Sequence, residues 1–392
     1  MGKKVAKAAP AKMAAEKPAA KKAAEKPAAS PSSAKAGMMR QLQVPEPFKV
    51  VIGEIPQIEP EENEVQVDIA YCGICGSDIH AYKGKHPFVP TPAYPGHEGA
   101  GIISKLGKGA EKYGLKVGDK VTFEPNLNCG TCYNCRKGRY NICLNLKVMG
   151  CQMTERTKGM MADKFVAPAN KVVKIPKDMP LKKAAMTEPL AVGMHAVRRS
   201  DIKVGDHVVI LGAGTIGLSC LQFAKLAGAN ILMVADFLPK RLEIAKKLGA
   251  THVVDLSKEG SVAEYLAKNP QIMGEEGVDI AFECVGVEGS MNDCIKIARK
   301  GSTIMVLGVF GDEVNHFNAA WVQDREFNIL GSLMYTWRDV TDTVDAIYKN
   351  KVNVDIMITN TFDLNDGAQA FEAGDKLAKD NIKVMIKVSG KE

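Results

Sequence analysis

The sequence predicts an α/β protein in which an all-β module precedes a doubly wound parallel sheet. From about residue 39 to 188, short alternating runs are divided by Gly, Pro and Asn, a pattern typical of β-strands and turns. From about 189 to 332, apolar strands alternate with helical segments, which is typical of a parallel sheet covered by helices. Residues 333–392 return to short mixed elements, so we expect them to complete the first module.

The expected elements of the two modules differ in order and in length. In the first module, Glu64–Tyr71, Lys120–Phe123 and Phe165–Ala167 are predicted strands. In the second, the longest uncharged apolar stretch is broken by Gly and Gln. We interpret it as a strand at Val208–Leu211 and a helix ending near Leu226, not as a membrane span. The other elements expected there are strands at Ile231–Asp236, His252–Asp255, Asp279–Cys284 and Ser302–Leu307 and a helix at Pro239–Leu248.

Residues 1–38 are expected to form a disordered tail rich in Lys, Ala and Pro. Residues 1–37 contain nine Lys and two Glu, so they carry the whole net charge of +7 and leave the remainder neutral. With almost no large apolar side chains, they cannot bury enough surface to offset the entropy of ordering. A solvated tail is the preferred interpretation. A weak tether for nucleic acid or another polyanion and a cleaved targeting segment are the alternatives.

A glycine-rich turn follows the first strand of the second module. The run Gly212-Ala-Gly214-Thr215-Ile216-Gly217 leads from that strand into a helical stretch. Such glycines permit a tight turn, close approach of the backbone to a pyrophosphate and close helix–strand packing, and the helix N-terminus attracts the phosphates. The sequence therefore predicts a dinucleotide-binding site, with a purely structural turn as the alternative.

An acid at the end of the next strand indicates which dinucleotide is bound. Asp236 follows Gly217 by 19 residues. A carboxylate at this place accepts hydrogen bonds from the ribose hydroxyls of NAD and repels the 2′-phosphate of NADP. Arg241, five residues further on, would weaken this preference. We expect NAD as the cofactor, with Asp236 and Arg241 at its ribose.

Four of the ten Cys residues lie within fifteen residues of sequence. Their spacing, C-x2-C-x2-C-x7-C, can wrap one tetrahedral Zn²⁺ and leave no position for solvent, as in a structural zinc site. The chain has no signal-peptide pattern, and clustered Cys favour a metal site in a reducing compartment over disulfides. We therefore expect a soluble, cytoplasmic protein. The four predicted ligands are Cys129, Cys132, Cys135 and Cys143.

A second metal site is predicted from residues that are more widely separated. Cys75 lies in a Gly-rich segment, and His97 and Glu98 follow about twenty residues later. A thiolate, an imidazole and a carboxylate can hold Zn²⁺ and leave one position open for substrate. Each residue alone is ordinary, since a single Cys is usually buried and a single His in a loop usually lies on the surface.

Together these motifs resemble the zinc-containing alcohol dehydrogenases of the medium-chain type. Residues 96–110, GHEGAGIISKLGKGA, are similar to the family signature, and the four-cysteine segment and the glycine turn follow in the family's order and approximate spacing. The resemblance covers roughly residues 40–392. It implies a GroES-like catalytic domain at 39–188, completed by 333–392, and a Rossmann domain at 189–332.

The resemblance also implies which residues hold the catalytic zinc. It makes Cys75 and His97 ligands, and it places Glu98 on the metal directly or through water. The segment Thr187–Leu190 resembles the one that supplies a Glu near zinc in sorbitol, threonine and butanediol dehydrogenases. Glu188 therefore joins the predicted set, as a harder oxygen ligand where simple alcohol dehydrogenases have a second Cys.

Two further residues match the family's proton relay. Ser77 stands where the family has a relay hydroxyl, and His80 where it has the residue that passes the proton to solvent. A capping hydroxyl and a surface His are the alternative interpretations. Cys72 matches no family ligand, and His195 lies in an apolar helical stretch, so we interpret both as packed residues.

The expected activity is reversible, NAD-linked oxidation of a secondary alcohol to the ketone, with two zinc ions per chain. The Glu98 and Glu188 pattern resembles the branch that acts on polyols, sugar acids, diols and threonine. Met334, where sorbitol dehydrogenases carry Arg, and Ala81 after His80 disfavour sorbitol itself. The resemblance implies a homodimer or homotetramer. The alternatives are a catalytically silent protein that binds zinc and NAD, and a dehydrogenase with an added polyanion-binding tail.

Overall fold

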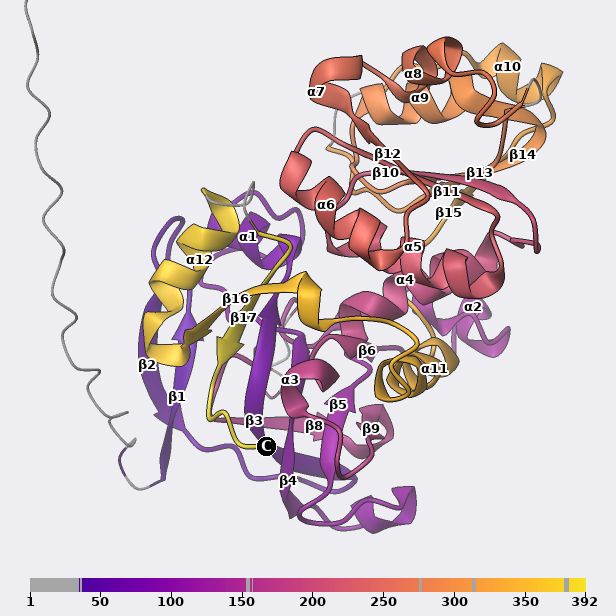
Figure 1. Ribbon diagram of the computed structural model, residues 1–392. Helices are drawn as coiled ribbons and strands as arrows, with labels where there is room; N and C mark the ends of the chain where they lie inside the picture. Colours follow the sequence, from indigo (N-terminus) through magenta and orange to yellow (C-terminus); the bar gives the residue numbers. More distant parts are fainter. Residues whose placement is uncertain are drawn as a thin grey trace, which may run out of the picture. The chain divides into compact units, whose positions relative to one another are not determined.

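The structure is a computed structural model that describes residues 35, 37–152, 156, 158–274, 277–311, 315–376 and 381–392. The predicted disordered tail lies outside these residues, apart from residues 35, 37 and 38. The described residues belong to one contact unit, which is shown in Figure 1. None of their helices is both long and apolar enough to span a lipid bilayer.

A seven-stranded, mostly antiparallel sheet contains strands from both ends of this unit. Its order is β16-β17-β3-β4-β5-β9, and β8 also pairs with β3. The C-terminal strand β17 runs antiparallel to β3, with Val384 opposite Ile74, and Figure 1 shows the yellow strands β16 and β17 beside β3. Residues 333–392 therefore contribute two strands to the sheet of the first module. The strands are β3 (Glu64–Ile74), β4 (Glu98–Leu106), β5 (Lys120–Phe123), β8 (Lys164–Pro168), β9 (Val172–Lys174), β16 (Ile358–Asp363) and β17 (Lys383–Lys387).

Short elements surround this sheet. Two small antiparallel pairs are formed by β1 (Met38–Gln43) with β2 (Val51–Pro56), and by β6 (Asn126–Leu127) with β7 (Lys147–Val148). The short helices are α1 (Gly76–Tyr82), α2 (Tyr133–Arg136), α3 (Leu181–Ala184) and α12 (Gly367–Asp375). The 3₁₀ turns are η1 (Ala110–Tyr113), η2 (Tyr140–Ile142), η3 (Ala169–Lys171), η4 (Asp355–Met357) and η5 (Leu364–Asp366).

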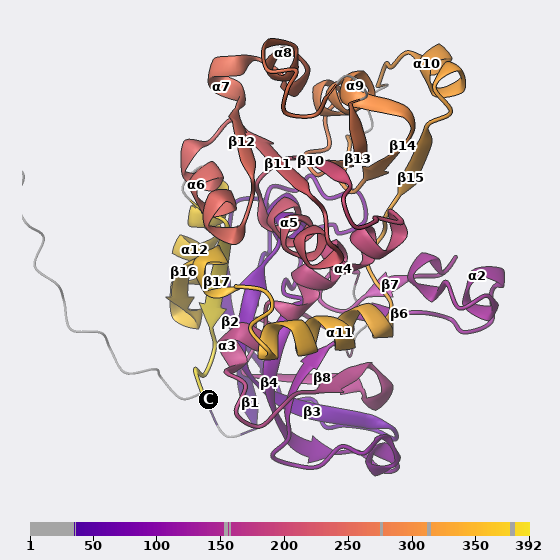
Figure 2. The same cartoon turned by 45° about the vertical axis from the view of Figure 1, so that its right-hand side comes forward.

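The second sheet has six strands, all parallel. Figure 2 shows its order from left to right as β12-β11-β10-β13-β14-β15. The order reverses between β10 and β13, and in sheets of this type the crevice at that point binds ligands. The strands are β10 (His207–Leu211), β11 (Ile231–Asp236), β12 (His252–Asp255), β13 (Val278–Glu283), β14 (Ala298–Val306) and β15 (Asn328–Gly331). The helices between them are α5 (Thr215–Ala227), α6 (Pro239–Leu248), α7 (Leu256–Glu259), α8 (Val262–Lys268), α9 (Glu288–Ile297) and α10 (Ala319–Asp324).

Alternating side chains of β10 show that both faces of this sheet are covered. Val208 and Ile210 pack in one apolar core with α5 and α6, whereas Val209 and Leu211 pack in another with α8 and α9. Successive side chains of a strand point to opposite faces, so an uninterrupted apolar strand requires helices on both sides. The first of these cores also contains residues of β3 and β4, and of the longer helices α4 (Thr187–Arg199) and α11 (Trp337–Tyr348).

The predicted elements agree with the observed ones, with local differences. The bounds of β5, β11, β12 and α6 are as predicted, and β10 and α5 occupy the apolar stretch interpreted as strand and helix. Strand β14 begins at Ala298, earlier than predicted, because Ala298 pairs with Val278 before an irregularity shifts the register. The charged residues Arg299 and Lys300 in that irregularity hide the strand's true beginning in the sequence.

Candidate metal and cofactor sites

Three of the predicted catalytic ligands lie together where β3 ends and β4 begins. Cys75 follows the last residue of β3 and caps α1, and Glu98 is the first residue of β4, opposite Gly73 of β3. The antiparallel pairing thus brings His97 and Glu98 next to Cys75. One possible ligand atom from each of these three residues lies within 4.8 Å of the others. Cys75 is partly buried, and His97 and Glu98 are buried.

Asp78 joins the two loops that carry these residues. Its Oδ2 accepts a hydrogen bond from the backbone N–H of Cys75 at 2.8 Å, and its Oδ1 accepts one from Gly96 at 3.1 Å. Its Oδ1 also lies 3.8 Å from Nδ1 of His97. Burial works against protonation of His97, but the charges of Asp78 and Cys75 outweigh it and raise the pKa of His97. Asp78 was not among the predicted site residues, although an acid three residues after a helix N-cap is a recognisable capping signal.

Glu98 forms a buried ion pair with Lys383, which was not among the predicted site residues. Nζ of Lys383, the first residue of β17, lies 2.6 and 2.7 Å from the two carboxylate oxygens of Glu98. The same Nζ donates to the backbone carbonyl of Ile74 at 3.0 Å. Burial lowers the pKa of Lys383, but the charges of Glu98, Cys75 and Glu188 and the hydrogen bond to Glu98 together outweigh it, so the pKa is raised overall. No local pattern could reveal this pair, because its members are 285 residues apart in sequence.

Glu188 lies in the same cleft, on the second residue of α4. Its side chain is buried, and its Oε1 accepts a hydrogen bond from Oη of Tyr335 at 2.6 Å. Burial raises the pKa of Glu188 to about 7. Glu188 is outside the tight group of Cys75, His97 and Glu98, so the structure brings three of the four predicted ligands together and leaves the fourth close by.

The remaining predicted site residues of this module lie on or near α1. Ser77 is partly buried and His80 is exposed, and their spacing of three residues puts them on one side of the helix. Cys72 is fully buried, as expected of a packing residue. Nδ1 of His195 lies 2.8 Å from Oδ2 of Asp339 inside the protein, which agrees with the interpretation of a hydrogen-bonded core histidine.

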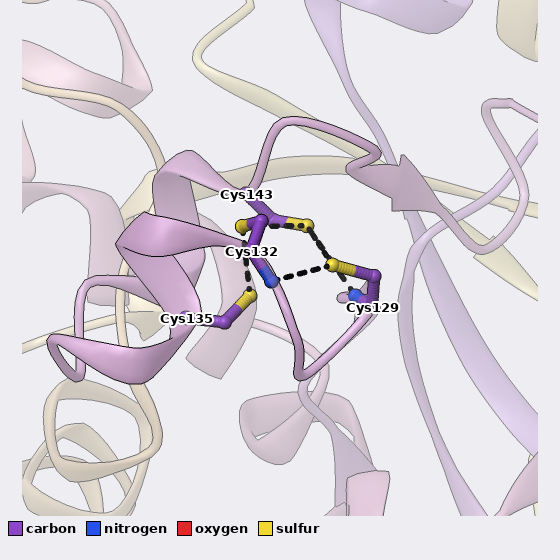
Figure 3. A group of neighbouring side chains, drawn as sticks. All are labelled: Cys129, Cys132, Cys135 and Cys143. Atoms are coloured by element: carbon purple, nitrogen blue, oxygen red, sulfur yellow. Dashed lines mark hydrogen bonds between the residues drawn. The ribbon is translucent and has the colours of Figure 1, made fainter.

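The four-cysteine segment is folded around its sulfur atoms, as Figure 3 shows. The sulfur of Cys132 lies 3.5 Å from that of Cys135 and 3.9 Å from that of Cys143, and Cys143 lies 3.5 Å from Cys129. Zn–S bonds of about 2.3 Å would set tetrahedral sulfur atoms about 3.8 Å apart. No disulfide joins them, and backbone N–H groups of Cys129 and Asn145 donate to the sulfur of Cys143. These four thiols therefore form a site that fits one structural zinc ion.

The glycine turn between β10 and α5 has the backbone that the sequence predicts. Gly212 has a φ of 98°, a left-handed conformation that favours glycine. A Cβ on Gly217 would collide with the carbonyl oxygen of Gly212, so helix and strand could not approach as closely. Gly214 caps α5, and a Cβ there would meet only a guanidinium nitrogen of Arg241, at 3.8 Å. The space in front of Gly214 thus lies open for a ligand.

Two cavities adjoin this turn. The first, of about 290 Å³, is lined by Gly214, Thr215 and Ile216 together with Cys75, Glu98, Glu188 and Lys383. The second, of about 590 Å³, is lined by Gly212, Asp236 and Arg241 and by apolar residues of the second sheet's loops. The glycine turn therefore lies between the candidate metal ligands on one side and Asp236 on the other.

Asp236 ends β11 at the wall of the larger cavity. Its Oδ2 accepts a hydrogen bond from the backbone N–H of Ala213 at 2.7 Å, and its Oδ1 accepts one from Leu238 at 2.9 Å. Each oxygen keeps a further lone pair for a ligand hydroxyl. Arg241 lies 3.9 Å from Asp236 and donates to the carbonyl of Asn381, so it contacts both the glycine turn's module and the C-terminal segment.

Two protein families match most of the described unit. Residues 61–177 match the alcohol dehydrogenase GroES-like domain, and residues 215–349 match the zinc-binding dehydrogenase family. The first match contains Cys75, His97, Glu98 and the four-cysteine segment, and the second begins at the glycine turn and contains Asp236.

Curated relatives match over nearly their whole length. An uncharacterised zinc-type alcohol dehydrogenase-like protein of Escherichia coli is 38% identical over 89% of this chain and 98% of its own. An L-idonate 5-dehydrogenase of Vitis vinifera is 34% identical over 85% of this chain and 89% of its own. The D-xylulose reductase of Saccharomyces cerevisiae is 33% identical over 85% of this chain and 92% of its own.

Solved structures of similar sequence have the same fold. An E. coli oxidoreductase of unknown specificity superposes with a TM-score of 0.83 at 33% identity, over 90% of this chain and 99% of its own. A zinc-binding dehydrogenase from Sinorhizobium meliloti, bound to NADP, superposes with a TM-score of 0.81 at 30% identity, over 90% of this chain and 99% of its own. An alcohol dehydrogenase from E. coli, complexed with NADH, superposes with a TM-score of 0.82 at 27% identity, over 90% of this chain and 100% of its own.

Proposed function

Since the chain belongs to the zinc-dependent alcohol dehydrogenase family, we propose that it oxidises a secondary alcohol of a small polar substrate to the ketone, reversibly and with NAD as hydride acceptor. One observation carries this proposal. The cavity lined by Cys75, Glu98 and Glu188 is also lined by Gly214 at the N-terminus of α5. A substrate hydroxyl held beside Cys75 and Glu98 and a dinucleotide held at Gly214 would therefore meet in one cleft, which is what hydride transfer requires.

The donor atoms at the head of β4 fit a catalytic zinc. Cys75, His97 and Glu98 supply one thiolate, one imidazole and one carboxylate, and buried Nδ1 of His97 has no hydrogen-bond partner among the described residues. These three residues would hold the ion, whose chemistry when bound is to lower the pKa of a coordinated alcohol. Glu188, whose Oε1 is held by Tyr335, would accept a hydrogen bond from the hydroxyl in the open position.

The other site residues bind the cofactor and move the proton. Ser77 would accept the proton released by the substrate hydroxyl and pass it toward exposed His80 and solvent. Backbone N–H groups from Gly214 to Gly217, at the positive end of α5, would bind the pyrophosphate. Asp236 would accept hydrogen bonds from the adenosine ribose, beside Arg241.

The substrate class follows from Glu188 and from the relatives. Two of the curated relatives are named for acting on D-xylulose and L-idonate, a sugar and a sugar acid. Their alcohol forms carry several neighbouring hydroxyls, and Glu188 provides a carboxylate in the cleft that would bind such groups. We therefore assign the substrate to the polyols, sugar acids, diols and hydroxy amino acids.

The proposal is tested by following NADH formation with a panel of polyols, sugar acids, diols, threonine and simple alcohols, before and after treatment with a zinc chelator. Turnover that is confined to polyhydroxylated or related substrates and lost with the chelator is the expected result. Protein that contains two zinc ions and binds NAD but turns over none of the panel would overturn it. We further propose that the enzyme is a homo-oligomer, as its family resemblance implies. We also propose that it is located in the cytoplasm, which the absence of disulfides among its ten cysteines, all of them described by the structure, supports.

A further inference from the structure

A short segment, residues 333–337, connects the four-cysteine lobe with the candidate catalytic cleft. Here the lobe means residues 129–143, from the first to the last of the four cysteines. The segment follows β15 and ends at the first residue of α11, and its central residue, Tyr335, has no exposed surface. The hydroxyl of Tyr335 donates to Glu188 at 2.6 Å, within the cleft. The position of this segment therefore determines where the Glu188 carboxylate is held.

Two neighbouring residues of the lobe hold the segment at both ends. Tyr140 and Asn141 are the first two residues of η2, between the third and fourth cysteines. Nδ2 of Asn141 donates to the carbonyl of Leu333 at 2.9 Å. The backbone N–H of Trp337 donates to Oη of Tyr140 at 2.5 Å. The bonds from the lobe thus enclose Tyr335, two residues from it on either side.

Three buried polar residues next to Tyr140, namely Glu124, Asn126 and Lys171, stabilise the same arrangement. Oη of Tyr140 donates to Glu124 at 2.8 Å, and Nζ of Lys171 donates to Glu124 at 2.9 Å and to Asn126 at 2.8 Å. Nδ2 of Asn126 in turn lies 3.3 Å from the carbonyl oxygen of Tyr335 itself. Glu124, Asn126 and Lys171 are buried, so their geometry has little freedom to change without leaving a buried polar atom unpaired.

The segment does not take this conformation by local preference. Met334, immediately before Tyr335, has a φ of 51°, in the left-handed region that non-glycine residues seldom occupy. Such a conformation persists only where surrounding contacts fix it. The contacts that fix it here are those from Asn141, Asn126 and Tyr140.

We infer that the four-cysteine lobe, through Tyr140 and Asn141, positions Tyr335 on Glu188 and so sets the geometry of the catalytic metal site. The inference rests on the proposed function, because it assigns Glu188 to that site. In this arrangement Tyr140 is a positioning residue: its hydroxyl bonds to Glu124 and to the backbone N–H of Trp337, and it acts on the catalytic cleft through that backbone. The metal of the lobe would then do more than stabilise the fold, since it fixes the turn η2 from which these bonds come.

The test uses full-length protein with zinc in the lobe and cobalt(II) exchanged into the catalytic site. Its visible absorption depends on the ligands around the ion, including the solvent or substrate oxygen to which Glu188 would be hydrogen-bonded. Tyr140→Phe removes the hydroxyl and keeps the ring. Tyr133→Phe is the matched control, because Tyr133 lies in the same lobe and is 72% exposed. Tyr335→Phe removes the hydrogen bond to Glu188, so its cobalt spectrum is the reference for a site in which Glu188 is not positioned.

The expected result is that Tyr140→Phe shifts the cobalt absorption in the direction given by Tyr335→Phe and lowers kcat by about tenfold or more, the usual cost of losing an outer-shell partner. Tyr133→Phe leaves both unchanged. In the double variant, Tyr140→Phe adds little to Tyr335→Phe, because both changes act through one hydrogen bond. Asn141→Ala is expected to act in the same direction, and it serves if Tyr140→Phe lowers the folded yield.

Two outcomes separate this inference from the proposed function. A loaded cobalt site whose spectrum is unchanged by both Tyr140→Phe and Asn141→Ala, or effects that add fully to those of Tyr335→Phe, would overturn the inference alone. A protein that takes up no metal at Cys75, His97 and Glu98 would overturn the proposed function instead.

Discussion

Lys383 and Glu98 form an ion pair inside the candidate active site, with Nζ 2.6 and 2.7 Å from the two carboxylate oxygens. Both side chains are almost completely buried, at 3% and 0% exposed. The pair joins the C-terminal strand β17 to the first residue of β4, next to His97. It therefore fixes the orientation of a predicted metal ligand and ties the C-terminal segment to the site.

Removing the positive member of this pair should destabilise the protein strongly. Lys383→Met leaves Glu98 charged, buried and unpaired, and loss of one partner of a buried pair typically costs about 3–5 kcal/mol of unfolding free energy. Chemical denaturation of protein whose catalytic site has been emptied of zinc measures this change, because a bound zinc ion would itself pair with Glu98. Lys387→Met is the matched control on the same strand, because Lys387 is half-exposed and lies 3.9 Å from exposed Asp363. Equal effects of the two substitutions would contradict the role given to Lys383.

Two glycines of the same turn should respond differently to Ala. A Cβ on Gly217 collides with the carbonyl oxygen of Gly212, so Gly217→Ala should lower the melting temperature and the yield of folded protein. A Cβ on Gly214 meets only Arg241, at 3.8 Å, so Gly214→Ala should keep the fold but weaken dinucleotide binding. Thermal unfolding and NADH fluorescence titration measure the two effects. A Gly214→Ala protein that binds NADH like the wild type would show that the cofactor lies elsewhere.

Features set by neighbouring residues could be predicted from the sequence, whereas contacts between residues distant in sequence could not. The glycine turn, β11 and α6 are local patterns, in which the spacing of apolar residues, Pro239 and Gly249 determines the element, and they were predicted closely. The cluster at Cys75 and His97 was found through a resemblance, because no spacing alone brings these two residues together. Lys383 and Tyr335 were missed as partners, because each acts on an acid more than 140 residues away in sequence. Only the folded chain brings such residues into contact.

The preference for NAD should depend on the charge of Asp236. Asp236→Gly removes the carboxylate that would repel a 2′-phosphate, and it should raise kcat/KM with NADP relative to NAD by roughly tenfold or more, about 1.4 kcal/mol. Asp236 also accepts hydrogen bonds from Ala213 and Leu238, so Asp236→Asn is the second variant, which loses the charge and keeps an acceptor. If both variants have the same ratio of kcat/KM with NADP to kcat/KM with NAD as the wild type, this assignment is refuted.

The two cysteines near the end of β3 provide the sharpest test of the metal site. Cys75→Ser replaces a thiolate that lies with His97 and Glu98, so zinc content should fall from about two to about one ion per chain, with activity lost. Cys72→Ser alters a fully buried neighbour outside that group, so zinc content should stay near two and activity should persist. Metal analysis of both purified variants gives the result independently of the substrate. Because the four cysteines of the lobe are unchanged in both, the remaining ion in Cys75→Ser should resist chelation as the structural ion does. Retention of two zinc ions and full turnover by Cys75→Ser would remove Cys75 from the site and, with it, the proposed mechanism.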